Sequence, residues 1–378
     1  MSGRRGLNLN VHGARGLFAM AVFVYHVVNS GLPTPAWLAG SYFQTYFLES
    51  FKSGVELFFG ISGYVIVGAL ARAPSLRVFT WERITRLFPV LWATLFVITL
   101  LALGTGRPLP SLGMWLLNFL AMPPFFDVPQ VNPAAWSLGY EMTFYALCAA
   151  AWWLRGRGVQ GWLVIGVAVG ALFLIFFPRA VLMICGVAIA SGRLDGQRWR
   201  WLGAFPSFTL ILFLVVWRAI EVRSGTFIIS ISPALMPFGQ WLTIVPAIIL
   251  SGALGMMALK GIVDGRGPFG AFLRTRVMQW LGTISYSFYL WHPVVMAAAK
   301  HAMKTVGVVE QAGAASQLLF GLLSIGPALA IAHLSQLYLE ARLTRKLRRL
   351  LEGRAARTPA AVDGLLADRK PVLDRTDR

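Results

Sequence analysis

Two ionisable side chains lie within long apolar stretches and could catalyse proton transfer. His26 lies in the apolar segment 11–30, and Glu141 lies in the apolar segment 134–154. An ionisable group inside a membrane helix costs about 2.5–3.5 kcal/mol on insertion scales, so such a group is a functional candidate. Imidazole and carboxylate groups are common general acids and bases. The alternative for His26 is a packed histidine, and the alternative for Glu141 is a structural ion pair with an arginine.

Three arginines predict a site for an anion. Arg15 precedes His26 by eleven residues, which is about three helical turns, so both side chains lie on one face about 16 Å apart. Arg83 and Arg86 are three residues apart on one helical face, ahead of Pro89. Guanidinium groups bind phosphate through paired hydrogen bonds. The alternative is that these arginines only mark the cytoplasmic ends of their helices.

A late segment, 278–303, presents three polar residues on one face. Ser285, Tyr289 and His292 follow i, i+4, i+7 spacing, and Pro293 loosens the backbone beside the histidine. Their positions make them candidate binding residues. Helix packing is the alternative for the aromatic residues, and a satisfied core hydrogen bond is the alternative for His292.

The stretch around Glu141 supplies two further candidates for binding. Ser137 begins this stretch, and Tyr145 is one turn beyond Glu141 on the same face. Glu56 is the other acid within an apolar segment. Because Glu56 lies nearer the membrane interface, a structural role and a functional role are about equally favoured for it.

Ten apolar segments must position these residues. The chain of 378 residues is 57% hydrophobic and only 13% charged, whereas soluble domains carry about 25% charged residues. Runs of about 20 apolar residues span a bilayer as helices, and these runs are too long for the strands of a membrane barrel. The sequence therefore predicts an all-α, polytopic integral membrane protein of about ten helices. The expected helices are 11–30, 51–71, 84–104, 134–154, 162–177, 179–192, 203–219, 240–259, 278–303 and 314–340.

The net charge of +19 follows the predicted membrane topology. With both termini in the cytoplasm, 27 of the 34 Lys and Arg residues fall in cytoplasmic segments and 7 in external ones. This distribution obeys the positive-inside rule. Charge spread over many loops forms no single basic stripe, which argues against nucleic acid as a partner.

The chain reads as one membrane domain, 1–341, followed by a basic tail, 342–378, that is expected to be disordered and cytoplasmic. The cluster at the start of the tail is expected to lie against anionic lipid headgroups. Cys148 and Cys185 both lie inside expected helices. Two such cysteines predict neither a disulfide framework nor a metal site, and we expect no bound cofactor. The first apolar segment is expected to remain as a membrane helix rather than to be cleaved.

Five blocks, in order, resemble the motifs of the acyltransferase family 3 membrane proteins. Glu56 stands where that family usually has Asp, and Met142 replaces a second acid of the fourth-helix block. The five blocks are Gly13-Ala14-Arg15-Gly16 with His26, Gly54–Tyr64, Arg83–Pro89, Trp136–Tyr145 and Ile284–Pro293.

The resemblance implies an enzyme of the bacterial inner membrane that uses cytoplasmic acyl-CoA, often acetyl-CoA, as its co-substrate. The family's acceptors are hydroxyl groups of O-antigen, exopolysaccharides, peptidoglycan-type glycans, signalling oligosaccharides and macrolides. The resemblance also implies that His26 is the general base and that Glu141 orients or stabilises it. The CoA phosphates would be held by Arg15, Arg83 and Arg86. Two alternatives stay open: a multi-pass transporter for a glycan, lipid or small acid, and a non-catalytic subunit of a polysaccharide export complex. The sequence does not indicate an oligomeric state.

Overall fold

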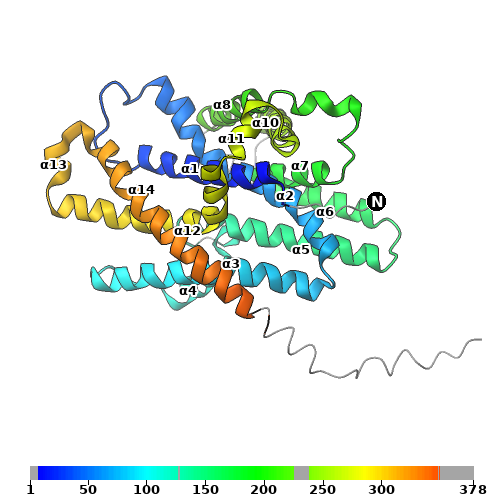
Figure 1. Ribbon diagram of the computed structural model, residues 1–378, viewed down its shortest axis with the longest axis horizontal. Helices are drawn as coiled ribbons and strands as arrows, with labels where there is room; N and C mark the ends of the chain where they lie inside the picture. Colours follow the sequence, from blue (N-terminus) through cyan, green and yellow to red (C-terminus); the bar gives the residue numbers. More distant parts are fainter. Residues whose placement is uncertain (1–6, 127, 225–237, 348, 350–378) are drawn as a thin grey trace, which may run out of the picture.

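The fold is a bundle of helices (Figure 1). The computed structural model describes residues 7–126, 128–224, 238–347 and 349. No strand occurs in these ranges. The predicted all-α class is therefore confirmed for the described part of the chain, while residues 350–378 of the expected tail lie outside it.

Each of the ten expected segments coincides with a helix of the structure. The α-helices are α1 (Leu9–Val28), α2 (Gly54–Arg72), α3 (Leu76–Gly104), α4 (Leu112–Phe119), α5 (Trp136–Gly156), α6 (Trp162–Phe176), α7 (Val181–Ala190), α8 (Pro206–Ser224), α10 (Phe238–Asp264), α11 (Gly267–Leu273), α12 (Arg276–Thr305), α13 (Val308–Ala312) and α14 (Ser316–Ser335). Short 3₁₀ or π segments are η1 (Phe43–Leu48), η2 (Glu49–Ser53), η3 (Pro123–Phe125), η4 (Pro178–Ala180), η5 (Gln197–Gly203), η7 (Gly313–Ala315) and η8 (Gln336–Leu343).

Helix α3 begins earlier than the sequence predicts. The expected start at residue 84 is wrong, because Ser75 caps the helix by accepting a hydrogen bond from the backbone N–H of Val78. The helix also continues through Pro89. Arg83 and Arg86 consequently lie inside a continuous helix rather than at its first turn.

The last long helix extends past its expected end at residue 340. Helix α14 continues directly into the π-helix η8, and the helical chain then runs to Leu347. Figure 1 shows this orange segment crossing α12 and reaching α3, which η8 contacts. The C-terminal helix therefore reaches the part of the bundle that carries Arg83 and Arg86.

Several helices are long and apolar enough to cross a membrane. Among the described residues there are 5: Leu9–Val28, Phe43–Arg72, Leu76–Gly104, Ile244–Asp264 and Val308–Leu347. A bent pair, Gln197–Gly203 with Pro206–Val222, adds a sixth if it is one span. Helices α5 and α12 are not among them, and both carry several polar residues. The expected ten crossings and the orientation of the termini stay predictions.

Glycines allow the closest helix crossings. A Cβ on Gly63 of α2 would lie 1.9 Å from the carbonyl oxygen of Met183 in α7. A Cβ on Gly282 of α12 would lie 2.2 Å from the carbonyl oxygen of His12 in α1. Small residues permit such close contact between membrane helices. These two crossings fix α12, which carries Ser285, Tyr289 and His292, and α2 against their neighbours.

Candidate active site

A cavity of about 1280 Å³ contains most of the predicted site. It lies between α1, α2, α3, α5 and α12. Eight of the ten candidate residues line it: Arg15, Arg83, Arg86, Ser137, Glu141, Tyr145, Ser285 and Tyr289. The sequence therefore identified residues that the fold brings together from four helices.

Glu141 is held at the cavity wall by two hydroxyl groups. Ser62 of α2 donates a hydrogen bond to Glu141 Oε1 over 2.6 Å, and the Tyr145 hydroxyl donates to the same oxygen. Tyr145 is one turn away on α5, as its spacing predicts. No described residue donates a hydrogen bond to Oε2. This oxygen is therefore available to a ligand or water in the cavity.

Four arginines line the cavity. The three candidates among them, Arg15, Arg83 and Arg86, are poor in protein partners. Neither Arg15 nor Arg86 forms a hydrogen bond or ion pair of 4 Å or less with any described residue. Arg83 stacks against two aromatic rings, with its guanidinium carbon 5.6 Å from the centre of the Phe79 ring and 5.8 Å from that of Tyr145. Each guanidinium carries five N–H donors. The cavity thus contains unused donors and positive charge that suit a polyanionic ligand.

His26 and His292 lie outside the lining of this cavity and contact each other. Their ring centres are 5.1 Å apart. His292 is completely buried; its Nδ1 lies 3.1 Å from the carbonyl oxygen of Phe288, and its Nε2 has no hydrogen-bond partner among the described residues. The structure gives His292 contact with His26 rather than a place in the cavity wall.

The expected contact between His26 and Glu141 is not present. The partners of Glu141 are Ser62 and Tyr145. The ring of His26 packs against those of Tyr25 and His292. Eleven residues separate His26 from Arg15 on α1, about 16 Å along the helix. Arg15 is an electrostatic neighbour of Glu141. His26 therefore lies outside the cavity, away from the end that contains Arg15 and Glu141.

Tyr289 connects these two parts of the site. Its ring centre is 6.0 Å from that of His292, and its hydroxyl oxygen is 3.1 Å from Ser137 Oγ. Ser137 is one helical turn before Glu141 on α5. Side chains of α5 and α12 therefore link the carboxylate to the imidazole pair along the cavity wall.

Sequence reasoning missed Glu340 and the role of Ser62. Glu340 lies in η8, accepts a hydrogen bond from Ser287 over 2.6 Å, and is an electrostatic neighbour of Arg86 and Arg15. It falls at the expected end of the last span, where an acid gives no signal of its own. Ser62 stands beside Gly63 in an apolar helix, and nothing in its spacing indicates that it reaches Glu141.

Glu56 has the structural role that the sequence left open. Arg179 Nη2 lies 2.6 Å from Glu56 Oε1, and the carboxylate is fully buried. The same guanidinium lies over the ring of Trp136, 4.1 Å from its centre. Glu56 does not line the large cavity. Its partner follows Pro178 in the short turn η4, so the pair joins α2 to the start of α7.

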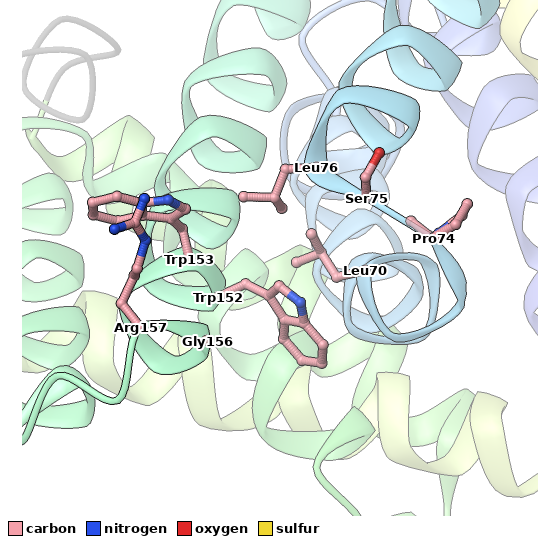
Figure 2. A pocket seen from close by; sticks show the side chains of 9 residues that line it. Leu70, Pro74, Ser75, Leu76, Trp152, Trp153, Gly156 and Arg157 are labelled. Carbon is pink, nitrogen blue, oxygen red and sulfur yellow. The ribbon is translucent and has the colours of Figure 1, made fainter. Parts of the chain in front are cut away.

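A smaller cavity of about 310 Å³ lies where α2 ends, α3 begins and α5 ends. Figure 2 shows Trp152 and Trp153 facing Leu70 and Leu76 across it, with Arg157 beside Trp153. The Arg157 guanidinium carbon is 5.0 Å from the centre of the Trp153 ring. This cavity holds none of the candidate residues and has the aromatic and basic lining typical of a membrane interface.

Metal and disulfide chemistry find no support in the described residues. They contain no group of three or more His, Cys, Asp or Glu side chains that could hold a metal ion. Cys148 and Cys185 are both free. The groups available for chemistry in and beside the cavity are therefore hydroxyls, a carboxylate, guanidinium groups and the adjoining imidazoles.

Long apolar helices around a cavity with several lining arginines fit a membrane protein. Residues 8–333 match the family described as the acyltransferase domain. The chain belongs to acyltransferase family 3. No solved structure matches it.

Curated relatives fall in the same class. "Acyltransferase MdmB" of Streptomyces mycarofaciens is 24% identical over 317 residues, which are 75% of this chain and 78% of the relative. "Exopolysaccharide production protein ExoZ" of Rhizobium meliloti is 27% identical over 335 residues, 84% of this chain and 95% of the relative. "Putative peptidoglycan O-acetyltransferase YrhL" of Bacillus subtilis is 26% identical over 342 residues, and the match spans 48% of that longer protein.

Proposed function

We propose that the protein is a membrane O-acyltransferase that moves an acyl group, most simply acetyl, from cytoplasmic acyl-CoA to a hydroxyl of a cell-surface or secreted carbohydrate. The family supports acyl transfer, and the names of two relatives, which refer to exopolysaccharide production and to a peptidoglycan O-acetyltransferase, support a carbohydrate acceptor. The observation that carries the proposal is an arginine-lined cavity that ends next to a histidine pair.

The donor would enter with its phosphates at Arg15, Arg83 and Arg86. These guanidinium groups have N–H donors that no described residue occupies, so they can bind phosphate without breaking an internal ion pair. The pantetheine arm would extend along the cavity past Glu141 and the Ser137–Tyr289 pair. Ser285 also lines this route.

In the transfer step, His26 would remove the proton from the acceptor hydroxyl. The hydroxyl oxygen attacks the thioester carbonyl carbon, a C–O bond forms, the C–S bond breaks, and the proton returns from the imidazolium to the leaving CoA thiolate. His292 is close enough to hold the His26 ring. Glu141, bound by Ser62 and Tyr145, would act on the donor side, where its charge also compensates Arg15.

The cellular setting belongs to the same proposal. Residues 1–341 would form the catalytic membrane domain of about ten spans in a bacterial inner membrane, with both termini and the basic segment 342–378 in the cytoplasm. The lipid bilayer, the acyl-CoA donor and a carbohydrate or glycolipid acceptor would be its partners, with no nucleic acid and no bound metal or cofactor.

Transfer of radiolabel from [¹⁴C]acetyl-CoA to envelope or secreted glycan, measured in purified membranes, tests this function. The wild-type protein should transfer label, whereas His26→Ala and Glu141→Ala should lower the rate by about 10²–10⁴-fold, the usual contribution of a general acid–base group, at equal protein levels. Undiminished transfer by His26→Ala would overturn the assignment. A wild-type protein that moves a glycan across the membrane without acylating it would be a transporter instead.

A further inference from the structure

The carbonyl of Thr85 in α3 has lost its regular donor within the helix. In a regular α-helix it would accept a hydrogen bond from the backbone N–H of residue 89. Residue 89 is proline, which has no N–H and whose ring also pushes against the carbonyl one turn earlier. Thr85 lies between Arg83 and Arg86, so this break in the hydrogen-bond ladder is located at the arginines of the cavity.

A residue from the far C-terminal end of the chain satisfies this carbonyl. Thr344 Oγ1 donates a hydrogen bond to Thr85 O over 2.8 Å, and both residues are buried. A buried carbonyl left without a donor would cost about 1–3 kcal/mol. Thr344 therefore does for α3 what the missing N–H of residue 89 would do in an unbroken helix.

The same stretch of α3 is held from a second side. The hydroxyl of Tyr286 in α12 donates a hydrogen bond to the carbonyl oxygen of Leu87. The C-terminal segment is itself fixed to α12, because Ser287 donates to Glu340 over 2.6 Å. Two neighbouring carbonyls near the proline thus receive side-chain donors from elements that are distant in sequence.

We propose that the segment Gln336–Thr344 is a positioning element of the donor site, and that the Thr344 hydroxyl sets the direction of Arg83 and Arg86. Thr344 does not line the cavity, so it acts through α3 and not on the donor itself. This inference rests on the proposed function, in which these arginines bind acyl-CoA. The segment lies beyond residue 333, where the match to the family ends.

The test uses substitutions that change one hydrogen bond. Thr344→Val keeps the shape of the side chain but removes the donor, and Thr344→Ser keeps the donor. For Thr344→Val we expect the KM for acetyl-CoA and the Kd for [³H]CoA to rise about tenfold, which corresponds to about 1.4 kcal/mol, while kcat stays within about twofold. Thr344→Ser should stay near wild type. Thr105→Val, which removes an exposed threonine hydroxyl from the other end of α3, is the matched control.

The decisive experiment restores the missing backbone N–H at residue 89. Pro89→Ala gives residue 89 an N–H that can donate to Thr85 O, so Thr344→Val should cost far less in that background. If Thr344→Val alone fails to fold, recovery of folded, CoA-binding protein in the double variant supports the proposal, and failure to recover overturns it. Wild-type affinity in Thr344→Val, or an equal loss of affinity in the Pro89→Ala background, would also overturn it.

The two proposals fail in different ways. If the wild-type protein neither binds [³H]CoA nor transfers label, the proposed acyl-CoA function is wrong. If the wild-type protein does both and the Thr344 variants behave like it, only the positioning role is wrong.

Discussion

At the scale of single residues, the site departs from a simple pair of histidine and carboxylate. Glu141 and His26 belong to two parts of the site that Tyr289 and Ser137 join. The partner of His26 is a second imidazole, His292, whose Nε2 is buried without a hydrogen bond to any described residue. A polar atom buried in this way lowers stability unless something compensates it. Because this nitrogen has no other partner in the part of the chain that the structure describes, we infer that it accepts a hydrogen bond from the His26 imidazolium that forms during proton transfer.

This role predicts that His292→Phe lowers kcat by about 10–100-fold and leaves the KM for acetyl-CoA unchanged. Phenylalanine keeps an aromatic ring beside Phe23 and Phe288, which surround this position, but has no nitrogen to hold His26. Thermal unfolding should be unchanged or occur at a higher temperature, because the unpartnered polar atom is gone. Steady-state kinetics of label transfer and a thermal unfolding curve in detergent measure both effects.

Phe23→Leu serves as the control for packing, since it changes the same surroundings without touching a nitrogen. If His292→Phe and Phe23→Leu have the same small effect on kcat, His292 is only a packing residue. A loss of thermal stability in His292→Phe would also count against the argument.

At the scale of helices, sequence patterns identified the elements well but not their contacts. Hydropathy located all ten long segments, because a run of apolar residues is a local property. The start of α3 was misplaced, since the sequence gives no measure of how well Ser75 caps a helix that must continue through Pro89. The role of Glu340 could not be predicted, because it depends on the return of the C-terminal helix to Ser287 and α3.

Eight of ten candidate side chains share one cavity because helical spacing places them on the inner faces of their helices. What spacing cannot give is the relative height of two helices. His26 and Glu141 were expected to meet because both lie at membrane depth, yet α1 packs against α12 and α2 rather than against α5. The correct neighbour of His26 comes from α12, which packs along α1.

The crossing of α2 and α7 gives a prediction at this scale. The Cβ of Gly63→Ala would lie 1.9 Å from a backbone oxygen of Met183, so the two helices must separate. Overpacking of this kind costs about 1–3 kcal/mol, occasionally more, and it would move the adjacent Ser62 away from Glu141. We expect a lower unfolding temperature together with reduced label transfer.

Gly326→Ala in α14 is the matched control, because a Cβ there meets no atom within 4 Å. Alanine is the better helix former by about 0.5–1 kcal/mol, so this variant should be as stable as wild type or more so. Equal behaviour of the two alanine variants would show that the α2–α7 crossing tolerates a methyl group.

At the scale of the whole molecule, contacts between loops sort the described ends of the helices into two groups. In one group, Asn8 at the start of α1 donates to Val263 O at the end of α10, and Arg266 donates to Arg200 O in η5. In the other group, Lys300 near the end of α12 donates to Ser30 O just after α1.

The second group also contains the ion pairs between the segment before α2 and the end of α8. Lys52 Nζ lies 2.6 Å from Glu221 Oε2, and Arg218 pairs with Glu49. These two groups coincide with the two sides that the distribution of Lys and Arg predicts. The positive-inside rule then predicts that the first group is cytoplasmic.

Cysteine accessibility tests this orientation in a background with Cys148→Ala and Cys185→Ala. Lys304→Cys, at the exposed end of α12, should react in intact cells with a maleimide that does not cross membranes. Arg193→Cys, in the segment that follows α7, should react only after the cells are permeabilised. The reverse pattern would put the arginine-lined end of the cavity on the outside, where no acyl-CoA is available. Catalysis with a cytoplasmic donor therefore requires this orientation. One labelling experiment can reject both the predicted orientation and the use of a cytoplasmic donor.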